Sequence, residues 1–155
     1  MFGFNTVSLD AKGRLLIPAR YRSDFKIQKN NRIVITKDPQ YPSLKISPGI
    51  EWDAISNKLI SLQGLDPIVR NIQWTILGNA YESDIDIDGR MLLRVPADLR
   101  EYAEIEEEKQ IALVGMGNKF EIWNINNWEM RQTGGSLSTE ILDVVLPESI
   151  KTMSF

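Results

Sequence analysis

The sequence lacks the two residue types on which most metal and nucleophile chemistry depends. Its 155 residues contain no cysteine and no histidine. The first absence excludes disulfide bonds, thiolate nucleophiles and cysteine-bound zinc, and the second excludes the usual general base and every histidine-containing triad. A glycine-rich phosphate loop is also missing, because "GMGNK" at 115–119 has neither a third glycine nor a Walker Lys-Ser/Thr pair. We therefore expect no enzyme, no cofactor and no metal site.

Long hydrophobic runs are missing as well. Apolar stretches such as "LLI" at 15–17 are far shorter than the roughly 18 to 20 residues that a membrane span needs. The first residues, "MFGFNTVSLD", lack the cationic and apolar segments of a secretory signal. The hydrophobic content of 43% is ordinary for a folded protein. We expect a cytoplasmic chain with no membrane partner.

Positive charge is slightly outnumbered by negative charge overall but is concentrated at one end of the chain. The net charge is −3, yet residues 1–37 hold eight cations and two acids, a local charge of +6 that leaves −9 for residues 38–155. A basic segment on an acidic body is typical of a protein that meets a polyanion from one side. A solvated positive face that binds nothing is the simpler alternative.

An internal repeat gives this basic segment a counterpart. "LDAKGRLLIPARYR" at 9–22 returns as "IDIDGRMLLRVPADLR" at 85–100, first at an offset of 76 residues and then, after two extra residues, at 78. Two strand-like segments repeat too, with "RIVIT" at 32–36 answered by "QIALV" at 110–114 and "LKIS" at 44–47 by "FEIW" at 120–123. The pattern indicates one unit used twice.

Each copy begins with a predicted β-hairpin. Asp10 and Gly13 stand at positions i and i+3 of a four-residue turn, as do Asp86 and Gly89 in the second copy. These are preferred residues of a type I turn. We expect "TVSLD" to lead into the first tip and residues 15–17 to form its return strand.

A short helix and two further strands complete the predicted unit. Pro18 suits the first turn of a helix over "PARYRSDF", which would carry Arg20 and Arg22. The segments "NRIVITKD" and "PSLKISP" are typical of strands. Between the copies, "PGIEWDAISNKLISL" and "DPIVRNIQWTILGNA" have helical spacing, the second with Asp66 as N-cap and Pro67 behind it. We expect these two to be packing helices.

The acidic stretch "DIDIDGR" at 84–90 imitates the start of a calcium-binding loop. If Asp84 is position 1, Val95 falls at position 12, where such a loop needs a bidentate glutamate. We therefore interpret this stretch as a hairpin tip whose acids face solvent or hold Arg90.

The repeat also carries a family resemblance. "MFGFNTVSLDAKGRLLIPARYR", "GNAYESDIDIDGR" and "NKFEIWN" resemble the MraZ family of bacterial transcriptional regulators, which have two SpoVT/AbrB-type domains. The resemblance covers residues 1 to about 130. It implies an α+β, mainly β fold in which two swapped-hairpin, AbrB-like repeats form a double-split β-barrel. The expected parts are a first repeat at 5–50, a helical connector at 51–79, a second repeat at 80–124 and a C-terminal helical segment and tail at 125–155.

The resemblance also implies a function. MraZ-like proteins are similar in forming ring-shaped homo-oligomers that bind short repeats of double-stranded DNA upstream of their own operon, usually as repressors of the division and cell-wall gene cluster. This would make the chain a sequence-specific, nucleoid-associated DNA-binding protein. Carried over by position, the DNA-contacting motif falls on Lys12 and Arg14, with Arg20 and Arg22 as helpers. The second copy has Asp88 where the first has Lys12, so the first copy is expected to meet DNA.

Elementary chemistry agrees with that assignment but leaves an alternative open. A β-ribbon fits the major groove, where arginine offers guanine a bidentate fork and lysine offers phosphate a point charge. Arg14 could instead form a salt bridge with Asp10 that stiffens the tip. For Arg90, which stands among acids, the salt bridge is the favoured interpretation.

Two other function classes stay open. The chain could be a protein-interaction module of antitoxin type that acts through its C-terminal tail, and deletion of residues 133–155 would then remove a co-purifying protein but spare DNA binding. It could also be a carboxylate enzyme that uses Asp84, Asp86 and Asp88, in which case a metal-dependent activity would be lost in Asp86→Asn.

Overall fold

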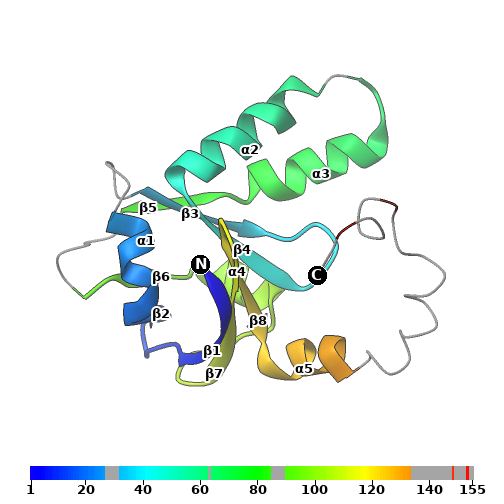
Figure 1. Cartoon of the computed structure of the whole chain (residues 1–155). Coiled ribbons are helices and arrows are strands. Elements are labelled where there is room, and N and C mark those ends of the chain that lie inside the picture. The colour runs from blue at the N-terminus through cyan, green and yellow to red at the C-terminus, as the bar shows by residue number, and fades with distance from the viewer. Residues whose placement is uncertain (27–31, 63, 85–89, 134–147, 149–152, 154–155) are drawn as a thin grey trace. The chain divides into compact units, whose positions relative to one another are not determined.

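The computed structural model describes residues 1–26, 32–62, 64–84, 90–133, 148 and 153. The chain divides into two compact units, Met1–Ile125 and Asn126–Phe155. The elements within the described ranges, labelled in Figure 1, are β1 (Phe2–Ser8), β2 (Arg14–Leu16), the 3-10 turn η1 (Ala19–Tyr21), α1 (Arg22–Lys26), β3 (Arg32–Lys37), β4 (Ser43–Pro48), α2 (Gly49–Ser61), α3 (Pro67–Gly78), β5 (Tyr81–Asp84), β6 (Leu92–Arg94), α4 (Ala97–Tyr102), β7 (Gln110–Met116), β8 (Phe120–Asn124) and α5 (Ile125–Thr133).

The described strands form two antiparallel sheets. Six of them make one large sheet in the order β1-β7-β8-β4-β3-β5, and β2 and β6 make a separate two-stranded ribbon. The prediction of a mixed α+β chain rich in strands is confirmed.

Several strands pair with a strand from the opposite half of the chain, although β3 with β4 and β7 with β8 pair within one half. Strand β1 pairs with β7, from Phe2 opposite Met116 to Ser8 opposite Gln110, while β5 pairs with β3 and β2 with β6. The expected return of residues 15–17 alongside β1 is therefore wrong, since β1 and β2 lie in different sheets. Burial explains the exchange: the β2–β6 pairing sets Leu15 opposite Leu93, and both side chains are fully buried.

The order of the large sheet has an internal symmetry. In the repeat, β5 is the counterpart of β1, β7 of β3 and β8 of β4. Exchange of each strand for its counterpart gives the same strand order in reverse. The central pair is β4 with β8, where Lys45 stands opposite Glu121 and Ile46 opposite Phe120. Lys45 forms its ion pair with Asp38, at 3.4 Å, and Glu121 accepts a hydrogen bond of 3.0 Å from Nε1 of Trp123.

One hydrophobic core joins the large sheet and the ribbon. It takes side chains from both halves of the chain, so neither half encloses a core alone. Its fully buried large members are Leu9, Leu15, Ile17, Ile33, Ile35, Leu44, Ile46, Met91, Leu93, Leu99, Ile111 and Phe120.

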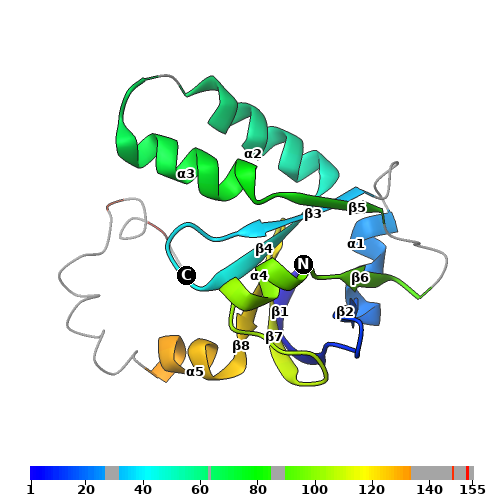
Figure 2. The same ribbon diagram turned by 180° about the vertical axis from the view of Figure 1, so that it is seen from behind.

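Helices α2 and α3 run next to each other at the β3 side of the large sheet in both views (Figure 1, Figure 2). Helix α3 starts as predicted, with the Asp66 carboxylate accepting a hydrogen bond of 2.9 Å from the Ile68 N–H and Pro67 as its first residue. The packing is only partial, because α2 buries Gly49 and Trp52 while α3 buries no residue. Among the residues that the structure describes, no helix has the length and apolar character to cross a bilayer.

Candidate nucleic-acid interface

The turn before β2 is organised by a single carboxylate. Oδ1 of Asp10 accepts hydrogen bonds of 2.9 Å from the backbone N–H groups of Lys12 and Arg14. The Gly13 N–H donates to the Asp10 carbonyl at 3.0 Å, and Gly13 has φ +73°, a left-handed conformation that favours glycine. Asp10 and Gly13 thus shape a tight turn that presents Lys12 to solvent.

Arg14 is held from one side and open on the other. Its Nε donates to Oδ2 of Asp10 at 2.7 Å. The backbone hydrogen bond from Arg14, with the help of its guanidinium and of the Lys12 N–H, lowers the pKa of Asp10 below its ordinary value. The side chain of Arg14 is 37% exposed. The salt bridge considered from the sequence therefore exists, and it involves only one of the three guanidinium nitrogens.

A second arginine stands directly opposite Arg14 across the ribbon. The pairing of β2 with β6 aligns Arg14 with Arg94. The next residue of each strand, Leu15 or Leu93, points into the core. Because successive side chains of a strand point to opposite faces, the two arginines lie on the outer face of the ribbon. Like charges at facing positions destabilise a strand pair, so stability alone does not account for this arrangement. An anionic ligand bound between the two guanidinium groups would account for it, because it would offset their repulsion.

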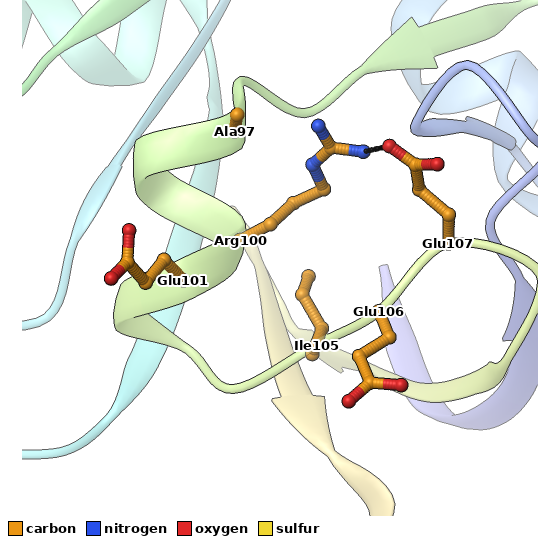
Figure 3. Close-up of a pocket in the computed structure, with 6 residues that line it drawn as sticks. All are labelled: Ala97, Arg100, Glu101, Ile105, Glu106 and Glu107. Carbon is orange, nitrogen blue, oxygen red and sulfur yellow. Dashed lines mark hydrogen bonds and ion pairs between the residues drawn. The ribbon is translucent and has the colours of Figure 1, made fainter.

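Helix α4 adds a third arginine to the turn. Nη1 of Arg100 donates to Oε1 of Glu107 at 2.6 Å, and Figure 3 shows Arg100 reaching from the helix toward Glu107 on the segment before β7. The guanidinium lies against the first turn, because a Cβ placed on Gly13 would come within 2.2 Å of Arg100 Nη1. These two side chains also line the small pocket of about 310 Å³ drawn in Figure 3.

These groups share one cleft, which we name the cationic cleft. It has a volume of about 500 Å³ and is lined by Lys12, Arg14, Arg94, Arg100 and Glu107. Four cations thus face one carboxylate, on a chain whose net charge is −3. The arrangement suits a phosphate-rich ligand, to which arginine and lysine donate charge-assisted hydrogen bonds.

Two residues of the cleft escaped the sequence analysis. Arg94 was not selected from the sequence, because its position opposite Arg14 depends on the pairing of β2 with β6, which was not predicted. Arg100 had a visible signal, since it is the counterpart of Arg22 in the repeat.

The remaining predicted residues lie elsewhere. Arg20 donates through Nη2 to the hydroxyl of Tyr21 at 2.5 Å and to the carbonyl of Phe4 at 3.3 Å, so it covers the outer edge of β1. Arg22 donates through Nε to the Ile17 carbonyl at 3.3 Å. Neither lines the cationic cleft.

The second predicted tip can be described only at its end. Arg90 is exposed. The predicted turn residues Asp86 and Gly89 lie outside the described residues, as does the rest of 85–89, the middle of the stretch that imitates a calcium-binding loop. Within the described ranges, no group of three or more acidic side chains could hold a metal ion.

Comparisons with known proteins agree with the resemblance predicted from the motifs. The family model described as "MraZ protein, putative antitoxin-like" matches residues 1–72 and 76–136. A protein of Hydrogenovibrio crunogenus named "Transcriptional regulator MraZ" is 41% identical over 152 residues, which cover 98% of this chain and 96% of that protein. Two further proteins of the same name are similar to this chain. The one from Legionella pneumophila is 36% identical over 152 residues, which cover 98% of this chain and 97% of that protein. The one from Shewanella oneidensis is 43% identical over 126 residues, which cover 81% of this chain and 80% of that protein. On these matches, the chain belongs to the MraZ family.

Proposed function

We propose that this protein is a transcriptional regulator that binds double-stranded DNA through the cationic cleft. The observation that carries the proposal is the gathering of four cations in one cleft: Arg14 and Arg94 on the outer face of the two-stranded ribbon, Lys12 in the turn before it and Arg100 on α4. The names of the relatives support a role in transcription and describe no enzyme.

The ribbon supports a direct reading of base edges. A two-stranded ribbon fits the major groove of B-DNA. Asp10 binds Arg14 through Nε at 2.7 Å, so the guanidinium is oriented before DNA arrives while its two terminal nitrogens stay available for the N7 and O6 atoms of a guanine. Lys12 is exposed beside it and would contact a phosphate. Arg20 and Arg22 would act as helpers at the DNA backbone.

The exchange of strands between the halves supports the finer fold expected from the family. In this proposal residues 5–50 and 80–124 are two SpoVT/AbrB-type repeats with swapped hairpins that close a double-split barrel. Residues 51–79 connect them, and residues 125–155 follow as a separate segment. One barrel would then present one ribbon, built by both repeats, to DNA.

Self-association is the second part of the proposal. Helices α2 and α3 and the segment between them expose large apolar side chains that a lone subunit would leave in water, namely Ile50, Ile60, Leu62, Leu65, Ile68 and Trp74. A second copy of the chain is the occupant expected from the family, and a closed ring would place several cationic clefts on one side. Repeated DNA elements upstream of the operon could then be bound together, with a gain in affinity from multivalency. Occupation of that region by a nucleoid-associated ring would repress the division and cell-wall genes.

The test compares variants of Arg14 on a duplex from the chain's own upstream region. We expect Arg14→Ala to abolish specific binding in a shift assay, and Arg14→Lys to keep weak binding without sequence preference, since lysine retains the charge but not the fork. Lys58→Ala on α2 removes an exposed cation outside the cleft and serves as the control. A folded Arg14→Ala protein that binds like the wild type would contradict the proposal.

A second candidate function is supported by the description of the family as antitoxin-like. In that case residues 133–155 would bind a partner protein. Deletion of these residues separates the two candidates, because DNA binding would persist while the partner would no longer co-purify.

A further inference from the structure

We propose that the second half of the chain supplies two phosphate ligands to the same DNA site. Arg94 is a direct ligand of a phosphate. Arg100 is a second phosphate ligand, for which the phosphate must compete with the Glu107 carboxylate; we call this the reserve role of Arg100. This inference rests on the proposed function and extends it, because the sequence assigned DNA contact to the first repeat alone.

The surroundings of Arg94 support a ligand role. It is exposed, it faces Arg14 across the ribbon, and among the described residues no acid or carbonyl binds its guanidinium. The inner face of the ribbon is already occupied by Leu15 and Leu93, so Arg94 contributes nothing to the core. A phosphate beside the ribbon would relieve the repulsion between the two arginines, which in the free protein is offset only on the Arg14 side, by the ion pair with Asp10.

Arg100 is a cation whose charge is balanced within the cleft. Its side chain is 16% exposed and that of Glu107 is 48% exposed, and the two groups are 2.6 Å apart. Only Nη1 of Arg100 takes part in this ion pair. A DNA phosphate that enters the cleft would compete with the Glu107 carboxylate for Arg100 and would be repelled by it. Glu107 therefore lowers the affinity for any anion and keeps Arg100 extended against the turn at Gly13.

The three arginines have different roles, which follow from their geometry and charge. Arg14 is oriented by Asp10 and reads a base, so its loss should remove sequence preference. Arg94 and Arg100 flank it and contact phosphates, so their loss should weaken binding to every sequence alike.

The experiment measures affinity against salt with the full-length chain. Fluorescence anisotropy is recorded over a series of NaCl concentrations for a duplex from the upstream region and for a scrambled duplex of equal length. We expect Arg94→Ala to flatten the slope of log affinity against log salt by about 0.9, the contribution of one phosphate contact, and to weaken both duplexes by a similar factor. Arg94→Lys should restore most of the slope, and Lys58→Ala, with the same loss of charge outside the cleft, should leave it near the wild-type value.

Glu107→Gln tests the reserve role without loss of a cation. We expect tighter binding to both duplexes and a slope steeper by about 0.9, because Arg100 becomes fully available to phosphate. Arg100→Ala should change both quantities in the opposite direction. If that variant does not fold, Glu107→Gln still decides the question.

The possible failures are distinguishable. A wild-type slope in Arg94→Ala, or a loss of sequence preference there, would overturn the phosphate assignment of Arg94. An unchanged slope in Glu107→Gln would overturn the reserve role of Arg100. Absence of binding by the wild-type protein, or full binding by Arg14→Ala, would instead overturn the proposed function itself.

Discussion

Replacement of Gly13 by alanine tests whether the first turn and helix α4 are coupled as the structure has them. Gly13 has φ +73°, where a residue with a Cβ atom costs about 1–2 kcal/mol more than glycine. The new methyl group would also lie 2.2 Å from Nη1 and 2.8 Å from Cζ of Arg100. The arginine would have to move away from the turn.

The magnitude of the effect has two parts. The backbone conformation contributes about 1–2 kcal/mol. Displacement of Arg100 disturbs its ion pair with Glu107, which contributes at most about 1 kcal/mol because Glu107 is 48% exposed to solvent. We therefore expect Gly13→Ala to lower the free energy of unfolding by about 1–3 kcal/mol. At about 2–4 °C for each kcal/mol in a chain of this size, Tm should fall by roughly 2–12 °C.

The assay is thermal and urea unfolding followed by circular dichroism. Gly78→Ala is the matched control, because the added Cβ meets no atom within 4 Å beyond its chain neighbours and the backbone of its own helix, and the φ of Gly78 is not in the left-handed region. We expect that variant to be unchanged or slightly stabilised. Comparison of Gly13→Ala in the wild-type and Arg100→Ala backgrounds separates the two parts, since truncation of Arg100 removes the clash but not the backbone strain.

The reasoning would be refuted by either of two results. Equal stability of Gly13→Ala and Gly78→Ala would mean that the turn does not need glycine. An equal cost of Gly13→Ala in both backgrounds would mean that Arg100 does not lie against the turn.

Two further predictions concern the acid response and the assembly. The pKa of Asp10 is lowered in the folded chain, so the stabilisation that its carboxylate contributes is present above the ordinary value of 3.8 and is lost as pH falls through the lower folded value. Unfolding measured across the acid range should therefore show a smaller pH dependence in Asp10→Asn, and an identical dependence would contradict this assignment. Trp74 is 61% exposed on α3, and we expect Trp74→Glu to reduce the mass measured by light scattering while circular dichroism is unchanged. A wild-type mass in that variant would exclude Trp74 from the subunit interface.

Several local features could be predicted from the sequence. The turn between Asp10 and Gly13 and the start of α3 at Asp66 and Pro67 follow from interactions between residues two to four positions apart. Such interactions are encoded by short motifs, because each partner is at a known distance along the chain. The family resemblance depends on the same local signals, and the match over residues 1–72 and 76–136 confirms it.

The prediction was wrong for the first hairpin of the unit, where the partners of β1 and β2 had to be chosen. The segments of β1 and β2 have the pattern of a hairpin, yet they pair with β7 and β6. An alternating pattern states which face of a strand is buried but not which neighbour satisfies its backbone, and here the exchange lets both halves share one core.

The sequence by itself determined the turn, the start of α3, the surplus of positive charge in residues 1–37 and the family to which the chain belongs. Only the tertiary structure decided that Arg94 stands opposite Arg14 and that Arg100 lies against Gly13 with Glu107 as its partner. The physical reason is that these contacts join residues far apart in the chain. They exist because burial of Leu15 against Leu93 brings the two ribbon strands together, and with them the charges on the outer face.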